Sequence, residues 1–308
     1  MGRENPSLEV LPPLSSPFNR IKVAGILSRG SRGYVVAAAK GVRSGSVYNY
    51  ELYIYSSMTE AWSTKMATLG GGCNTNWDYV RSHRTDKVIA IGTDSMGWVD
   101  LWFGIIVCNL LDEDNPTAYF VQIPGPMPGN EDHFGASSAR SFRDVECVGD
   151  MFKFVEIHFH RDDYQGENLG RKRIDFGWKA VAAWNSTLPS GDWSAGLTAD
   201  TNGIQLTDEI YSIVLPELHD DISEKLSVND LIWYGPTVSM DEDVLYMIFR
   251  LSLDPNEHKE WQVAIDMNKN AFEIISFTAE KKNFCDPTYR PIALSKIQVN
   301  HRNLMPLA

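Results

Sequence analysis

The sequence predicts an all-β, antiparallel fold that is propeller-like, and three observations lead to that prediction. Apolar and polar residues alternate over many short segments, as they do in strands and not in helices. The 308-residue chain has nine Trp and twelve Tyr, which favour strands. The short strands fall into about four groups, at 21–66, 87–124, 140–195 and 230–278. Repeated small antiparallel sheets of this kind are typical of a β-propeller.

We expect the ring of sheets to be incompletely closed, and a large β-sandwich is the alternative architecture. The groups are unevenly spaced, and no group carries a sharp repeat signature. Residues 1–20 are predicted to be irregular, because four prolines between positions 6 and 17 prevent a helix. Residues 21–308 are predicted to form a single β-rich domain.

The first group opens with predicted strands at 21–27 and 34–39, joined by a glycine-containing turn. A strand at 48–55 follows, because Tyr48, Tyr50, Leu52 and Ile54 would share one face. A short strand at 61–65 completes the group. The third and fourth groups have the same character, with aromatic and aliphatic strands that end at polar turns.

The second group contains the most hydrophobic stretch of the chain, residues 97–111. We predict one continuous buried strand there, followed by a polar turn at 112–116 and a return strand at 118–123. A strand that is apolar on both faces belongs in the centre of a fold. The side chains predicted to be buried are Trp98, Leu101, Ile105 and Val107.

Charge and composition limit the classes of partner. A net charge of −12 argues against nucleic acid, which requires a basic surface. No apolar run is long enough to span a membrane, and the start of the chain has no apolar signal core. We therefore expect a cytoplasmic or nuclear protein that binds no nucleic acid and no membrane.

The four cysteines are far apart and show no CxxC spacing, so a zinc site is not expected. Cys108 and Cys147 lie in apolar strands and are predicted to be small buried residues. We predict no catalytic residue, no metal ligand and no cofactor. Whether the protein is an enzyme stays open, and the absence of activity is the stronger expectation.

His158 and His160 are the sharpest hint of chemistry. Residues two apart on a strand share a face, and Asp162 follows closely. Two histidines without a fixed third ligand fall short of what a transition metal requires, so an exposed strand end is the favoured interpretation. The alternative is an enzyme with its site near these three residues.

The central block of the chain resembles the hallmark of a plant family that is expanded in grasses. The family is known as domain of unknown function 1618. The resemblance lies in residues 97–102, Gly104-Ile105, Cys108 and the return strand that ends at Pro124. Weaker blocks along the rest of the chain, such as Trp261 with 264–267, follow the order of that family. The resemblance implies a β-rich fold and no known activity. This chain departs from the family at Phe103, where Arg is usual, and at Asn109, where Asp is usual.

The resemblance also implies about a hundred further β-rich residues before this chain begins, so the N-terminal segment of the family is expected to be missing. The strand at 21–27 would then lack neighbours, and Ile21, Val23 and Leu27 would form an exposed apolar face. Such an edge is a template for pairing with another chain. We therefore expect self-association through the N-terminal sheet.

The favoured function is a non-enzymatic protein–protein interaction module with an unidentified protein partner. Its predicted contact residues are Trp77, Tyr79 and Tyr164, because aromatic residues in polar loops often anchor interfaces. A shortened paralogue without a function of its own is a further alternative.

Overall fold

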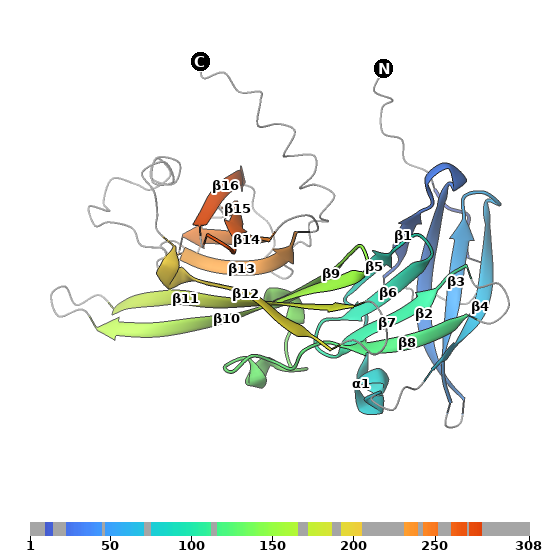
Figure 1. The fold of residues 1–308 in the computed structure, drawn as a ribbon, viewed down its shortest axis with the longest axis horizontal. Coiled ribbons are helices and arrows are strands. Elements are labelled where there is room, and N and C mark those ends of the chain that lie inside the picture. The colour runs from blue at the N-terminus through green and yellow to red at the C-terminus, as the bar shows by residue number, and fades with distance from the viewer. Residues whose placement is uncertain are drawn as a thin grey trace, which may run out of the picture. The chain divides into compact units, whose positions relative to one another are not determined.

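The computed structural model describes residues 10–14, 23–44, 47–70, 75–111, 116–165, 172–186, 192–204, 231–239, 243–251, 260–269 and 271–278. It confirms the predicted all-β fold class with antiparallel sheets. The chain divides into two compact units, Met1–Gln122 and Ile123–Ala308 (Figure 1). Both units hold strands of the range 21–308, for which the sequence predicts one β-rich domain.

The first unit contains two antiparallel four-stranded meanders. The first is formed by β1 (Gly25–Ser28), β2 (Tyr34–Ser44), β3 (Val47–Ser56) and β4 (Ala61–Leu69). The second is formed by β5 (Lys87–Ile91), β6 (Ser95–Asp100), β7 (Gly104–Asn109) and β8 (Thr117–Gln122). The two meanders correspond to the strand groups that the spacing predicts at 21–66 and 87–124, although the second is predicted to hold three strands and holds four.

The two meanders are not separate blades, because β4 and β8 pair in parallel. Thr68 lies opposite Thr117, and Leu69 lies opposite Ala118. One eight-stranded sheet results, with the order β1-β2-β3-β4-β8-β7-β6-β5. The last strands of both groups therefore meet in the middle of the sheet.

The two outer strands of this sheet, β1 and β5, also approach one another, so the sheet is a nearly closed barrel. Gly25 in β1 makes the approach possible, since a Cβ at that position would overlap Cγ1 of Val88 in β5. Leu27 is buried inside the sheet, and the exposed residue of β1 is its neighbour Ile26. The prediction that Leu27 lies on an exposed face is therefore wrong, because Leu27 points into the core and Ile26 points outward.

The predicted core residues Trp98, Leu101, Ile105 and Val107 are all buried, which confirms that part of the prediction. The single strand predicted over 97–111 is wrong. The chain turns at 101–103, between β6 and β7, and Asp100 binds the N–H groups of the turn. Hydrophobicity on both faces indicated burial correctly but concealed the turn.

Helices are short in the described part of the chain. The first unit has α1 (Trp77–Ser82) and the 3-10 turn η1 (Gly30–Arg32). The second unit has the 3-10 turns η2 (Glu131–His133), η3 (Ala139–Ser141) and η4 (Thr201–Gly203). None of the helices among the described residues combines the length and hydrophobicity needed to cross a membrane.

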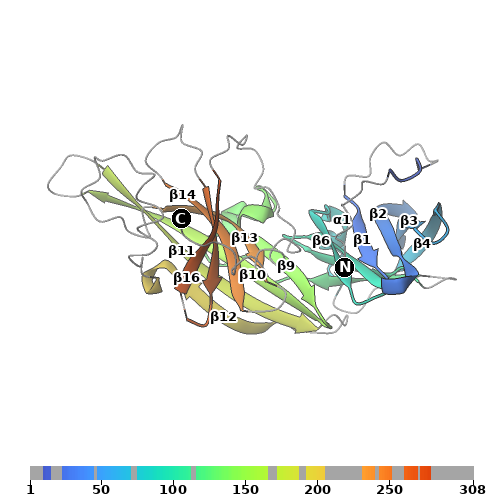
Figure 2. The ribbon, with the colours of Figure 1, turned by 90° about the horizontal axis from the view of Figure 1, so that it is seen from above.

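The second unit consists of two four-stranded antiparallel sheets. One has the order β12-β11-β10-β9 and contains β9 (Arg143–Val148), β10 (Met151–Gln165), β11 (Lys172–Ser186) and β12 (Ser194–Asp200). Its two longest strands, β10 and β11, pair along fifteen residues (Figure 2). The other contains β13 (Leu231–Val238), β14 (Val244–Leu251), β15 (Glu260–Asp266) and β16 (Ala271–Thr278).

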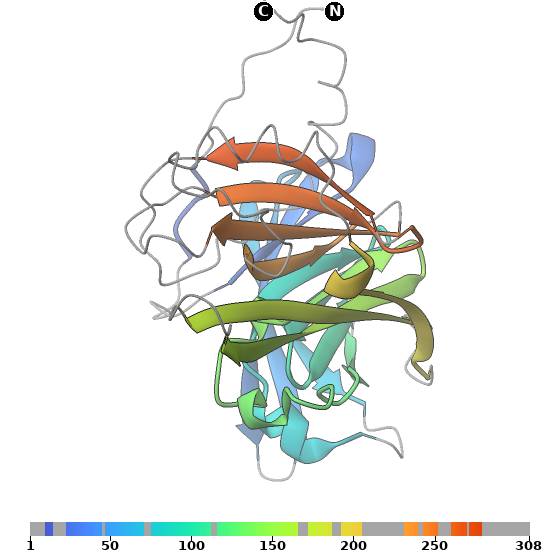
Figure 3. The same cartoon turned by 90° about the vertical axis from the view of Figure 1, so that its left-hand side faces the viewer.

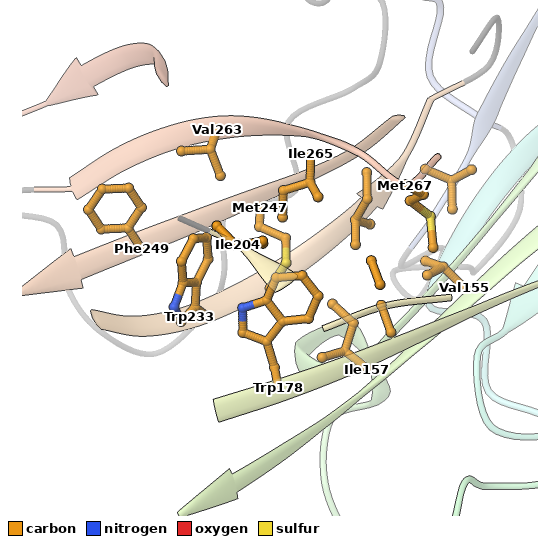
Figure 4. Close-up of a cluster of buried hydrophobic side chains, with 14 of the residues drawn as sticks. Val155, Ile157, Trp178, Ile204, Trp233, Met247, Phe249, Val263, Ile265 and Met267 are labelled. Carbon is orange, nitrogen blue, oxygen red and sulfur yellow. The ribbon is translucent and has the colours of Figure 1, made fainter. Parts of the chain in front are cut away.

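These two sheets lie face to face and enclose the core of the second unit (Figure 3). Trp178 of β11 contacts Trp233 of β13 edge-on at 5.7 Å between ring centroids, and Phe249 stacks on Trp261 at 5.3 Å. Figure 4 shows the labelled side chains of both sheets pointing toward one another. Aromatic packing between the sheets, as in Trp178–Trp233, and within one sheet, as in Phe249–Trp261, explains why Trp and Phe recur in the strands of the last two groups.

Candidate functional site

Trp77 and Tyr79, predicted to be loop aromatics, lie in helix α1. The side chain of Asn76 begins the helix by accepting hydrogen bonds from the backbone N–H groups of Asp78 and Tyr79. Trp77 is 36% exposed, whereas the Tyr79 ring packs against Phe103 with 5.1 Å between centroids. Tyr164 belongs to strand β10, and its side chain lies outside the described residues. The prediction that these three aromatics are loop residues is wrong.

His158 and His160 share one face of β10, as the alternation predicts, with 6.3 Å between ring centroids. Each ring lies against a glycine. A Cβ at Gly129 would overlap the ring of His158, and a Cβ at Gly177 would overlap the ring of His160. The side chain of Asp162 lies outside the described residues. The two glycines therefore provide the space that the imidazoles occupy.

A hydrogen-bond chain orients His158. Nδ2 of Asn130 donates to Oε1 of Glu156 at 2.8 Å and to the carbonyl of Ile157 at 3.0 Å. Oδ1 of Asn130 is thus the acceptor that faces Nδ1 of His158 at 3.2 Å. This geometry assigns the proton to Nδ1 and leaves Nε2 as the acceptor of the neutral ring.

These hydrogen bonds continue from Glu156 to a buried ion pair with Arg143. The Nη2···Oε2 distance is 2.7 Å, and the two side chains are 0% and 2% exposed. Glu156 also accepts from the N–H of Met127, and Arg143 donates to the carbonyl of Pro124. The pair therefore fastens the segment from Pro124 to Asn130 onto strands β9 and β10.

Burial lowers the pKa of His158, and the neighbouring His160 lowers it further, so the ring is neutral at pH 7. A fixed neutral imidazole is a weak base. Within the residues that the structure describes, no three His, Cys, Asp or Glu side chains are placed to hold a metal ion. The contacts of His158 are those of a residue that holds the Pro124–Asn130 segment in place.

Sequence reasoning missed an apolar row on the outer face of the first unit. Register places Ile26 opposite Val36, Val36 opposite Tyr55, and Tyr55 opposite Trp62, so the four side chains run across strands β1 to β4. We call these four residues the outer row. Val36 and Tyr55 are buried, Trp62 is half-buried, and Ile26 is 68% exposed. A row of this kind depends on strand register, which no local pattern reveals.

Residues 10–14, Val-Leu-Pro-Pro-Leu, meet the outer row at Trp62 (dark blue in Figure 2). The indole Nε1 of Trp62 donates to the carbonyl of Pro12 at 2.8 Å. Leu11 and Leu14 are half-buried, whereas Val10, Pro12 and Pro13 are exposed. The segment has no regular secondary structure, as the prolines predict.

The block of residues from Gly97 to Gly104 has a structural explanation. Asp100 accepts hydrogen bonds from the N–H groups of Arg84, Trp102 and Phe103. A Cβ at Gly97 would lie 2.8 Å from Cγ2 of Ile105, and one at Gly104 would overlap Phe120. The carboxylate and the two glycines therefore build a tight turn between two buried strands.

Part of the chain matches a family model. Residues 98–246 match DUF1618. The family is described as a protein of unknown function, and the match supports the resemblance found in the sequence. It covers just under half of the chain and runs from β6 to β14. No curated protein matches the chain.

Both departures from the DUF1618 pattern have a structural role here. Phe103 packs against Tyr79 and so makes an aromatic contact to helix α1. Oδ1 of Asn109 accepts from the N–H of Leu111 at 2.8 Å, which a carboxylate oxygen would do equally well. Asn109 therefore supplies the side-chain acceptor for the turn after β7.

Proposed function

We propose that the protein is a non-enzymatic, β-rich protein–protein interaction module and that the outer row is its binding surface. The observation that carries the proposal is the exposure of Ile26 at the open end of a continuous apolar row. Large exposed apolar side chains that adjoin buried aromatics are typical of interaction sites. Among the described residues, the exposed large hydrophobic side chains all belong to Met1–Gln122: Val10, Ile26, Met58, Met66 and Trp77.

We further propose that the whole chain, and not residues 98–246 alone, is a plant DUF1618 protein of the cytoplasm or nucleus. The blocks outside the matched range, such as Trp261 with residues 264–267, support the wider membership. The buried thiols of Cys108 and Cys147 and the net charge of −12 suit a reducing, aqueous compartment.

Affinity capture with the tagged full chain tests the interaction surface. Ile26→Asp places a charge in the outer row, and Met58→Asp is the matched control, because Met58 is 67% exposed and lies in the turn after β3. We expect Ile26→Asp to lose the proteins captured by the unaltered chain and Met58→Asp to retain them. Equal capture by all three chains would show that the outer row is not the binding surface.

The second candidate function is an enzyme with its site near His158, His160 and Asp162. The oriented, neutral ring of His158 is the observation that favours it. An activity present in the unaltered chain and abolished by His158→Gln, at unchanged stability, would support the enzyme. Loss of stability without any such activity would support the role of His158 in holding the Pro124–Asn130 segment.

A further inference from the structure

We propose that the outer row recognises proline-rich segments of a partner protein and that residues 10–14 of this chain occupy the same site in competition with that partner. The inference rests on the proposed function, because it names the class of partner that the interaction surface takes. It starts from the contact between Trp62 and Pro12, which are fifty residues apart in sequence.

The bound segment has the features of a polyproline II ligand. Leu11 and Leu14 are half-buried and three residues apart, while Pro12 and Pro13 between them face outward. A polyproline II helix has three residues per turn, so positions i and i+3 lie on one side. Pro12 and Pro13 have no backbone N–H, so the segment cannot form a continuous strand ladder, and its carbonyls stay available as acceptors.

The receiving surface has the matching features. Trp62 donates an indole N–H to the backbone of the segment, and its ring contacts Tyr55 with 5.5 Å between centroids. The ring of Tyr34 lies next to that of Tyr55, with 6.2 Å between centroids. Aromatic surfaces with an outward-facing donor are the usual receptors of proline-rich segments, because the preformed helix loses little entropy on binding.

The contact is suited to exchange. The hydrogen bond goes to a carbonyl of the main chain, so any segment with the same backbone conformation can accept it. Residues 10–14 belong to the same chain as the sheet, so their effective concentration is on the order of millimolar, which a partner must overcome. The exposed Ile26 at the far end of the row offers a partner additional apolar contact.

The test uses a fluorescent peptide with the sequence of residues 8–16 and the full chain with the double change Leu11→Asp and Leu14→Asp, which we call the open variant. We expect the peptide to bind the open variant with a micromolar Kd, by fluorescence anisotropy. Binding to the unaltered chain should be at least about tenfold weaker, because its own segment competes. Absence of binding to the open variant would overturn the proposal.

Two substitutions separate the contacts. Trp62→Phe in the open variant keeps an aromatic ring and removes the donor, so we expect a roughly fivefold to tenfold loss of peptide affinity. Trp77→Phe is the control and should leave the affinity unchanged. A peptide with alanine in place of both prolines should bind at least about tenfold more weakly, and equal binding would rule out recognition of polyproline II.

The occupant and the proposed function are tested separately. A second copy as the occupant predicts that the unaltered chain associates in sedimentation velocity at about 10 μM, and that the open variant, whose segment cannot bind, does not. Such association would overturn the assignment to a partner protein.

If Ile26→Asp abolishes protein capture but no peptide binds, the interaction module stands and the proline-rich partner is wrong. If the peptide binds but Ile26→Asp leaves protein capture unaltered, the outer row takes proline-rich segments and the captured proteins bind elsewhere.

Discussion

Asp100 stabilises the turn between β6 and β7, which lies near the start of the residues that match DUF1618. Its two carboxylate oxygens accept from three backbone N–H groups, those of Arg84, Trp102 and Phe103. Asp100→Ala leaves these donors without their acceptor, and we expect the free energy of unfolding to fall by roughly 2–4 kcal/mol. Urea denaturation at pH 7 measures the loss. Asp100→Asn, which keeps one acceptor oxygen, should lose less, and an equal loss would contradict the account.

His83 should make the stability depend on pH. Burial lowers the pKa of His83 to about 4 from 6.5, although a hydrogen bond to the Trp98 carbonyl and the charge of Asp86 both act to raise it. Between pH 6.5 and pH 4 the unfolded chain therefore binds a proton that the folded chain does not. Protonation of the unfolded state makes stability fall as the pH decreases through this range and leaves it unaffected above pH 6.5.

Thermal denaturation of the unaltered chain and of His83→Gln at pH 7 and pH 5 checks this expectation. The difference in Tm between the two pH values should be smaller in the variant, which has no imidazole to protonate. An identical difference in both chains would assign the pH dependence to other groups, such as His158, whose pKa burial also lowers.

At the scale of elements, two ion pairs of similar length differ in their surroundings. Arg143–Glu156 between β9 and β10 is 2.7 Å long and buried, whereas Lys269–Asp266 after β15 is 2.6 Å long with side chains 77% and 31% exposed. Glu156→Gln leaves a buried guanidinium without its countercharge, so we expect a loss of about 3–5 kcal/mol. Lys269→Ala should cost less than about 1 kcal/mol.

Chemical denaturation of both variants provides the measurement. Hydrogen exchange adds a local readout, since Glu156→Gln should also accelerate exchange of the N–H of Met127, which bonds to Glu156. A small loss for Glu156→Gln, equal to that for Lys269→Ala, would show that the buried pair does not hold the Pro124–Asn130 segment.

The elements also show how far the sequence predicts this fold. Alternation located β2 and β3, and the strand groups were located because each is built from local hairpins. The parallel pairing of β4 with β8 was missed, because strands that are distant in sequence leave no local signal of their pairing. Helix α1 was missed although Asn76 is a readable N-cap.

The candidate site was less predictable than the fold. The alternation on β10 placed His158 and His160 on one face correctly. The acceptor and donor groups around His158 come from Asn130 in another segment, whose position only the folded chain determines. The outer row joins four strands through their register, so no stretch of sequence contains it.

At the scale of the molecule, the near closure of the first sheet is tested at Gly25. Gly25→Val places a side chain against Val88, so β1 must move away from β5. We expect a lower Tm and, since a free edge of β1 would be exposed, concentration-dependent self-association in sedimentation velocity. Gly125→Ala is the control, because a Cβ at Gly125 meets no atom within 4 Å.

The unaltered chain in the same experiment tests the self-association expected from the sequence. A concentration-dependent sedimentation coefficient would support pairing through β1. An unchanged coefficient over a tenfold range of concentration would contradict it. If the sedimentation of Gly25→Val is the same as that of the unaltered chain, the approach of β1 to β5 does not limit association.

The parallel seam between β4 and β8 has a consequence for the order of folding. Its backbone hydrogen bonds join Thr68 to Pro116 and Gly70 to Ala118, and closing so long a loop is slow compared with forming the hairpins on either side. The seam should therefore form after the transition state has been passed. Leu69→Ala, which weakens the buried side of the seam, should speed unfolding and leave the refolding rate nearly unchanged in a stopped-flow chevron experiment. The resistance of the first unit to transient opening would then depend on the pairing that assembles last.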